Sequence, residues 1–81
     1  MATEVGKAIH IFVEVDRQKQ VRVEFETDRV SGKQIKDAAG VPLDWDLAVR
    51  RGERLEVVTN NQVIEIRDGE HFVALPPGTI S

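Results

Sequence analysis

The chain has 81 residues, a formal net charge of −3 and no cysteine. A chain of this length holds one domain with a modest core, and the lack of cysteine excludes disulfides, thiolate metal sites and cysteine nucleophiles. Acidic and basic residues are interleaved, and the one basic cluster, at residues 50–54, contains an acid, so we expect a solvated turn there and no nucleic-acid binding. No apolar run can span a bilayer and the first residues lack a signal-peptide pattern, so we expect a cytoplasmic protein that does not enter membranes.

Residues 8–27 carry the clearest secondary-structure pattern. Apolar residues alternate with polar ones on both sides of a polar turn at residues 16–19: Ile9, Ile11, Val13 and Val15 before it, and Val21, Val23 and Phe25 after it. Two such β-branched alternating segments around a turn predict an antiparallel hairpin with one buried face. Phe12 lies on the opposite face of this alternation, and we expect it to contribute to an apolar contact patch on the surface.

A short helix is predicted to follow the hairpin. Ser31 and Gln34 have the spacing of a capping box, and Gly40 lies where a left-handed residue would end the helix. Between them, Ile35 and the alanines at 38 and 39 have helical spacing. A helix this short is marginal alone, so Ile35 must pack onto the hairpin.

Three more apolar segments follow, at residues 45–49, 55–58 and 63–66, and Asp68-Gly69 predicts a hairpin into a last strand at 71–75. A hairpin covered by one helix, with further strands in the same sheet, predicts an α+β fold of β-grasp type with a mixed sheet of four to five strands. We expect one domain over residues 1–81, ordered at about 8–76, with a flexible tail at 77–81. The expected core comprises Ile11, Val13, Val23, Ile35, Leu47 and Leu55.

Candidate catalytic and metal-binding residues are few. Asp44 and Asp46 are close in sequence, but general acid–base catalysis needs a buried carboxyl group, and we interpret both as exposed turn residues. His10 and His71 could approach each other within a sheet, yet a metal site would need a third ligand such as Glu14 or Asp68. We interpret both as ordinary strand histidines. The sequence therefore predicts no catalytic residue, no metal site and no cofactor, and we expect a protein that is not an enzyme.

The single tryptophan, Trp45, is open to two interpretations. An exposed tryptophan would be a natural centre for binding a partner. Its alternation with Leu47 and Val49 favours a position at the end of the core instead.

Two stretches resemble a known family. Residues 30–42, VSGKQIKDAAGVP, are similar to the "tGkeIkalAGip" helix of the bacterial multi-ubiquitin family, and Asp46-Leu47 fits its next strand. Residues 63–77, VIEIRDGEHFVALPP, resemble the family's "v.i.dGe.Fv..P" ending, so the match covers about residues 8–77. The resemblance implies a β-grasp fold and a role as a ubiquitin-like protein modifier.

The family's genes lie beside genes for E1-like and E2-like enzymes and a JAB-type peptidase, in operons tied to conjugation and antiviral defence. The resemblance therefore implies these enzymes and a set of target proteins as partners. By this analogy, the E1-like enzyme would adenylate the C-terminal carboxylate, which would then pass to a cysteine and on to a target.

The chain departs from the family in having one domain, where many members have several, and in lacking a terminal Gly-Gly. Either it is trimmed near its one tail glycine, or it is used as it stands, or it is not conjugated. We expect the tail to be extended and mobile and to be the site of activation or processing: Pro76, Pro77, Gly78, Thr79, Ile80 and Ser81. The alternatives are a non-covalent interaction module, which includes a self-assembling homo-oligomer, and, ranked last, a sulfur carrier, which should end in Gly-Gly.

Overall fold

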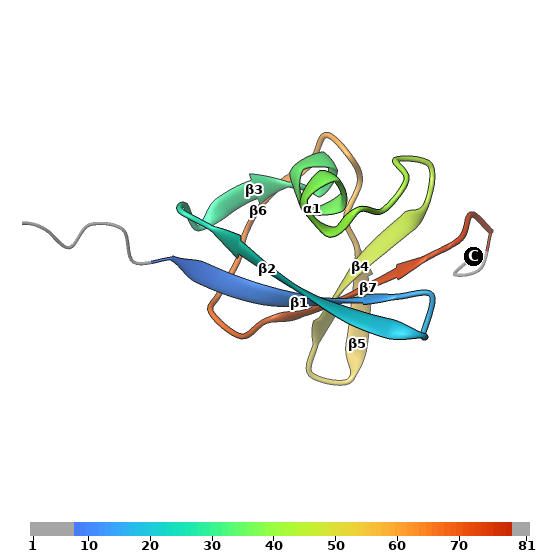
Figure 1. Cartoon of the computed structure of the whole chain (residues 1–81), viewed down its shortest axis with the longest axis horizontal. Coiled ribbons are helices and arrows are strands. Elements are labelled where there is room, and N and C mark those ends of the chain that lie inside the picture. Colours follow the sequence, from blue (N-terminus) through green and yellow to red (C-terminus); the bar gives the residue numbers. More distant parts are fainter. Residues whose placement is uncertain (1–7, 79–81) are drawn as a thin grey trace, which may run out of the picture.

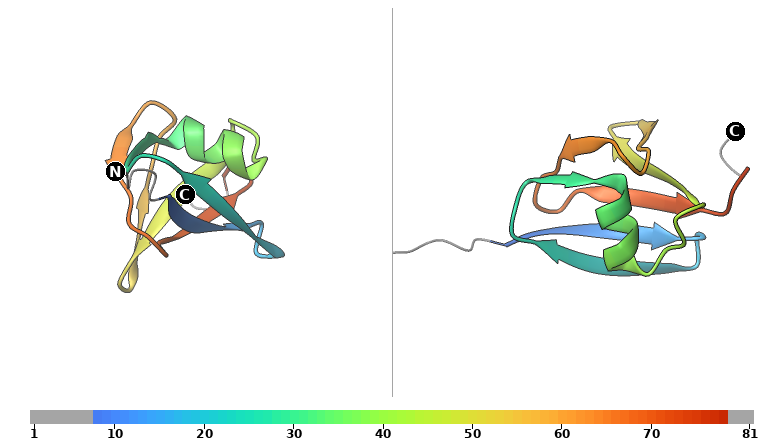
Figure 2. Two further views of the ribbon diagram at one scale, coloured as in Figure 1. Left: turned by 60° about the vertical axis from the view of Figure 1, so that its left-hand side comes forward. Right: turned by 90° about the horizontal axis from the view of Figure 1, so that it is seen from above.

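The computed structural model describes residues 8–78, which form one helix and seven strands arranged in two sheets. The main sheet contains β1 (Ile9–Val15), β2 (Lys19–Phe25), β4 (Asp46–Arg51), β5 (Arg54–Val57) and β7 (His71–Leu75). The second sheet contains β3 (Arg29–Ser31) and β6 (Val63–Glu65), and the helix is α1 (Gly32–Ala39). Helix α1 crosses one face of the main sheet and leaves the opposite face, here called the outer face, uncovered (Figures 1 and 2).

The main sheet has the strand order β2-β1-β7-β4-β5. Strands β1 and β7 are parallel, whereas β1 with β2, β7 with β4 and β4 with β5 are antiparallel. The last strand among the described residues is therefore the central one, and β2 and β5 are the two edges. The expected N-terminal hairpin, single helix and mixed sheet of the α+β class are confirmed, and the arrangement is compatible with a β-grasp fold.

The local signals around the helix are also confirmed. The Ser31 hydroxyl accepts a hydrogen bond from the Gln34 N–H at 3.2 Å, and the Gln34 side-chain oxygen accepts one from the Ser31 N–H at 2.8 Å. Gly40 ends the helix with a φ of +76°, in the left-handed region that glycine adopts without strain. The side chain of Ile35 is fully buried against the sheet.

The core lies between α1 and the inner face of the main sheet. Five of the six expected core residues are buried: Ile11, Val13, Val23, Ile35 and Leu47. Leu55 is not, because its place in β5 puts it on the outer face with 45% of its surface exposed. Within the segment 55–58 it is Val58 that enters the core. Trp45 is partly buried and packs against this core, as its alternation with Leu47 indicated.

The prediction of a hairpin at Asp68-Gly69 is wrong. Strand β6 pairs with β3, not with β7, and the turn carries the chain from the small sheet into the main one. Gly69 has the positive φ expected of such a turn, +84°. The reason lies in β7, whose residues 72–75 are buried on both faces of the sheet. In the central position both edges of that strand are paired, and side chains of β1 and β4 flank it on both faces of the sheet.

Candidate functional site

The segment after β7 is the first candidate site. Leu75 is buried at the end of the central strand, Pro76 is half-buried and Pro77 is exposed. Proline has no N–H and cannot extend the ladder, so the strand ends here. The expectation of an extended segment is wrong for residues 76–78, because the chain turns at Pro77-Gly78, where Gly78 has a φ of +84° (Figure 1). A Pro-Gly pair is the usual sequence of a type II turn, so this bend had a sequence signal. Residues 79–81 of the expected site, Thr79, Ile80 and Ser81, lie outside the described residues.

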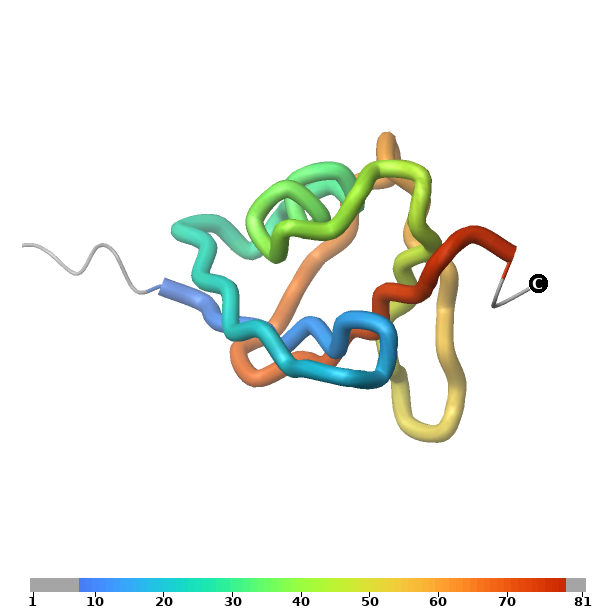
Figure 3. The backbone as a smooth tube through the Cα atoms, turned by 45° about the vertical axis from the view of Figure 1, so that its right-hand side comes forward, coloured from blue at the N-terminus to red at the C-terminus, as the bar shows by residue number. Residues whose placement is uncertain are grey.

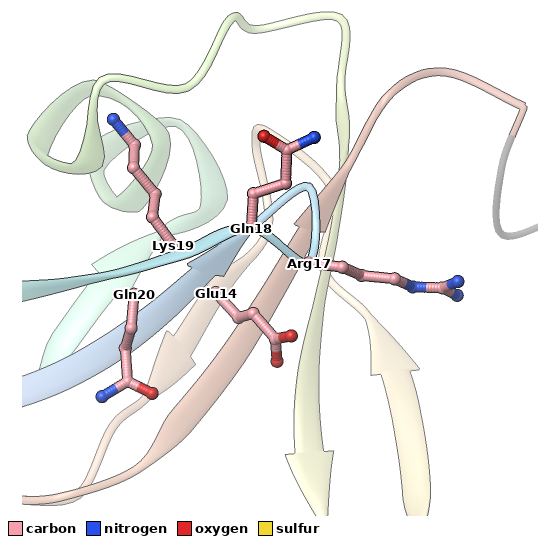
Figure 4. Close-up of a pocket in the computed structure, with 5 residues that line it drawn as sticks. All are labelled: Glu14, Arg17, Gln18, Lys19 and Gln20. Atoms are coloured by element: carbon pink, nitrogen blue, oxygen red, sulfur yellow. The ribbon is translucent and has the colours of Figure 1, made fainter.

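The β1–β2 turn lies at the same end of the molecule as this segment (Figures 1 and 2). The Asp16 N–H donates to the Ala74 carbonyl at 2.8 Å, which ties the turn to the end of β7. Around the turn lies a shallow, open hollow with a polar lining (Figure 4): Glu14, Arg17, Gln18, Lys19 and Gln20. Such an open hollow does not exclude water.

The same turn holds two residues in an uncommon backbone conformation. Asp16 and Arg17 have φ values of +53° and +58°, and the turn is closed by the Gln18 N–H donating to the Val15 carbonyl at 3.0 Å. The left-handed conformation is nearly free of strain at glycine and costs about 1 kcal/mol or more at arginine. The cost at aspartate lies between the two. The turn is therefore strained, next to the segment that leaves β7.

The outer face of the main sheet is the second candidate site. Phe12 projects from this face, opposite to Ile11 and Val13, as the alternation in β1 predicted. It is directly paired with His71 across the parallel β1–β7 ladder, and the two rings stack with centroids 5.2 Å apart and planes at 26°. This stack could not be predicted from the sequence, because it depends on the pairing of strands about 60 residues apart in the chain.

Apolar side chains continue from this stack across the sheet. Val73 of β7 is paired with Ala48 of β4, which is paired with Val57 of β5, and Leu55 lies on the same side of β5. Leu55 and Val57 expose 45% and 54% of their surfaces. We call these residues the outer-face patch: Phe12, Ala48, Leu55, Val57, His71 and Val73. Ala48 and Val73 are buried beneath their neighbours, so the exposed apolar surface of the patch comes from Leu55, Val57 and the partly exposed Phe12. Apolar side chains grouped in this way are typical of a surface that binds another protein.

The two histidines do not form a metal site. His71 is stacked on Phe12, whereas His10 lies beside Asp68, with 3.5 Å between Nδ1 and the carboxylate. The same Asp68 oxygen accepts a hydrogen bond from the His10 N–H at 3.0 Å, and the Gly69 N–H donates to the His10 carbonyl at 2.6 Å. Asp68 thus fixes the turn to β1. Within residues 8–78 no group of three His, Cys, Asp or Glu side chains is placed to hold a metal ion.

The charged residues singled out in the sequence lie on the surface. Arg51, in the basic cluster, has ion pairs of 3.3 Å with both Glu56 and Glu70, consistent with the expected solvated turn. Asp44 is exposed and Asp46 is only partly buried, so neither carboxyl group has the enclosed environment of a general acid. These residues support no catalytic role.

A buried lysine that the sequence did not reveal connects the helix to two loops. Lys36 is 3% exposed, and its Nζ donates to the carbonyl oxygens of Leu43 and Trp45, at 3.1 and 2.5 Å, and to the Asn60 side-chain oxygen at 2.7 Å. The Asn60 amide also donates to the Leu43 oxygen at 3.1 Å. All three acceptors are neutral, so this cluster, here called the Lys36 cage, satisfies the ammonium by hydrogen bonds alone. Its role is structural.

Comparisons of the sequence with models of known protein families and with curated proteins found no match. Within residues 8–78, no helix is both long and apolar enough to cross a membrane. The fold and the surfaces described above therefore define the class of protein. It is a small α+β domain with a mixed five-stranded sheet, an apolar patch on the outer face of that sheet and a proline-rich segment after its central strand.

Proposed function

We propose that this chain is a bacterial ubiquitin-like protein modifier of β-grasp type. In this proposal an E1-like enzyme activates the C-terminal carboxylate of the segment that follows β7, either as it stands or after trimming. An E2-like enzyme then transfers the chain to target proteins. A JAB-type peptidase would trim or release it, and the conjugation would serve a defence system, as in the family that the sequence resembles.

The observation that carries the proposal is the way in which β7 ends. Strand β7 is held on both sides by β1 and β4, and its last residue, Leu75, is 3% exposed. The segment that follows is therefore anchored to the central strand of the sheet, and the two prolines keep it from pairing further. An enzyme that activates a carboxylate must thread it through a narrow channel. Gly78 has no side chain to obstruct such a channel, so the segment can pass once its turn at residues 77–78 opens.

The test is an activation assay with an E1-like enzyme from the same genome. The 81-residue chain and a chain ending at Gly78 are each incubated with the enzyme and ATP, and intact-mass measurement detects an adenylate or thioester. We expect a thioester with one or both forms. Exposure of the 81-residue chain to the JAB-type peptidase tests for trimming at Gly78 in the same measurement.

The matched control is a chain ending at Leu75. We expect its free energy of unfolding to change by about 1 kcal/mol or less, since Pro77 and Gly78 are exposed, while thioester formation is lost. If the chain ending at Leu75 is still activated, or if neither longer form is ever activated, the modifier function is refuted.

The outer-face patch favours a second candidate function, a non-covalent protein-interaction module. The Phe12–His71 stack and the exposed Leu55 and Val57 form an apolar surface on a rigid sheet, and such surfaces bind partners without any covalent step. This function needs no activation of the tail.

The variant Phe12→Glu tests this second function. Phe12 lies outside the core, so the variant should stay folded, while retention of partner proteins should be lost. Gln18→Glu is the matched control, because it adds the same charge to an exposed position in the β1–β2 turn, outside the patch. Partner retention by Phe12→Glu equal to that of Gln18→Glu would remove the patch as a binding surface.

A further inference from the structure

Strand β5 is an edge of the main sheet, and it is short, exposed and only partly protected by its two charged side chains. All four of its residues, Arg54–Val57, are exposed, and the β4–β5 hairpin projects from the body of the molecule (Figure 3). Edge strands offer unpaired N–H and C=O groups to another chain, and natural proteins commonly protect such edges. Among residues 8–78, nothing pairs with the far side of β5.

The direction of the unpaired groups follows from the β4–β5 register. The Val58 N–H donates to the Leu47 carbonyl at 2.8 Å, and Val57 and Glu56 are paired with Ala48 and Val49. Hydrogen bonds in an antiparallel pair alternate along the strand, so residues 54, 56 and 58 direct their backbone groups toward β4. Residues 55 and 57 direct their N–H and C=O groups away from the sheet.

We infer that β5 pairs with β5 of a second copy of this chain, antiparallel and about a two-fold axis at Leu55. In this register Leu55 is opposite Leu55 of the second copy, and their outward N–H and C=O groups bond to each other. Arg54 is opposite Glu56 of the second copy, so that this carboxylate, which already has an ion pair of 3.3 Å with Arg51 of its own chain, would lie between two arginines. The symmetry repeats this attraction on the other side of the axis. The two main sheets become one continuous sheet.

Charge selects this register over its neighbour. A two-fold axis at Glu56 would also join outward-directed groups, but it would place Glu56 directly opposite its own symmetry copy. Like charges in directly opposite positions destabilise a sheet, whereas opposite charges stabilise it. The Leu55-centred register has two attractive pairs in place of this repulsion.

Strand β5 of a second copy is a better partner for this edge than strand β2 of a second copy. On the outer face, β2 presents Gln20, Arg22 and Glu24, which offer no apolar contact to Leu55 and Val57. Pairing of β5 with β2 would also be head-to-tail and would not close, whereas β5 with β5 closes as a dimer. In the closed dimer the exposed leucines and valines of both copies lie together on one face. This inference does not depend on activation of the segment after β7.

Cysteine cross-linking tests the register, because the chain contains no cysteine of its own. In a directly opposite hydrogen-bonded pair the Cα atoms are about 5.5 Å apart, which suits a disulfide. We therefore expect Leu55→Cys to form a covalent dimer in a glutathione buffer. In the same register the two Val57 positions lie roughly 13 Å apart along the strands, so the matched variant Val57→Cys should stay uncross-linked. Equal cross-linking of the two variants, or none with Leu55→Cys, would overturn the inference.

Charge exchange provides the second test, measured by sedimentation equilibrium. Arg54→Glu alone and Glu56→Arg alone should each raise the dimer dissociation constant about tenfold, because two attractive pairs become repulsive. A mixture of the two variants should form a heterodimer with the dissociation constant of the natural chain, because both pairs are attractive again. A natural chain that stays monomeric at millimolar concentration, or a mixture that does not regain association, refutes the proposed dimer.

Discussion

Replacing Lys36 by methionine would test how much the Lys36 cage contributes to folding. Methionine has nearly the same length and no donor, so Lys36→Met keeps the packing of α1 while removing the three hydrogen bonds of the ammonium. The acceptor oxygens then differ in whether another hydrogen-bond donor is left to them. The Leu43 carbonyl keeps the Asn60 amide as a donor, whereas the Trp45 carbonyl loses the one donor that the structure gives it at 2.5 Å.

The expected loss follows from these partners. A buried acceptor without a donor costs about 1–3 kcal/mol, and hydrogen bonds from a charged donor contribute about 1.5–3 kcal/mol net. Against this, methionine does not have to be removed from water as an ammonium does, which offsets part of the loss. We expect Lys36→Met to lower the free energy of unfolding by about 2–3 kcal/mol, a large share of the total for an 81-residue chain.

Urea denaturation followed by tryptophan fluorescence measures this change, since Trp45 belongs to the cage. With a slope of about 1 kcal/mol/M for a small domain, the midpoint should fall by roughly 2–3 M. Lys33→Met is the matched control, because Lys33 lies on the same helix but is exposed, and it should shift the free energy by less than about 0.5 kcal/mol. If Lys36→Met is as stable as Lys33→Met, the cage makes no net contribution and the reasoning fails.

Three further predictions concern the core, the helix start and the strained turn, all measured by urea or thermal unfolding. Ile35→Ala should cost about 2–4 kcal/mol because a fully buried side chain leaves a cavity, and an unchanged midpoint would mean that α1 does not pack on the sheet. Gly32→Ala should lower the free energy of unfolding more than Gly40→Ala, because a methyl group at 32 would collide with the Thr59 carbonyl. At 40 the methyl group would lie in open space, and the cost is only the backbone strain of about 1 kcal/mol at φ +76°. The reverse order would contradict the close approach of Gly32 to Thr59. Replacing Asp16-Arg17 by Asn-Gly should raise stability by about 1 kcal/mol, since these residues accept the left-handed conformation, and a loss of stability would show that the turn is not strained.

The parts of the fold that follow from short-range chemistry could be predicted from the sequence. The alternation in β1 and β2, the Ser31–Gln34 capping box and the helix end at Gly40 each depend on residues within a few positions of one another. The face of β5 could not be predicted in the same way. Apolar residues occupy both the odd and the even positions of this segment, at Leu55, Val57 and Val58. Only the pairing with β4 determines which of them enters the core.

The candidate sites likewise have parts that depend on nearby residues and parts that depend on long-range contacts. The position of Phe12 on the outer face followed from the alternation in β1, but its partner His71 depends on the long-range β1–β7 ladder. Lys36 follows a core residue in a short helix, where a lysine normally faces water. Its burial depends on carbonyl groups from residues 43 and 45 and on the amide at 60, which only the tertiary structure brings together.

The central position of β7 has a consequence for the synthesis of this protein in the cell. Strands β1 and β4 do not pair with each other, and each needs β7 to complete its hydrogen bonds. While the chain is growing on the ribosome, the hairpin of β1 and β2 and that of β4 and β5 are separate fragments, each too small to be stable alone. The sheet forms only when residues 71–75 emerge and insert between them. Until then, the apolar faces of both hairpins are exposed to chaperones and to other nascent chains.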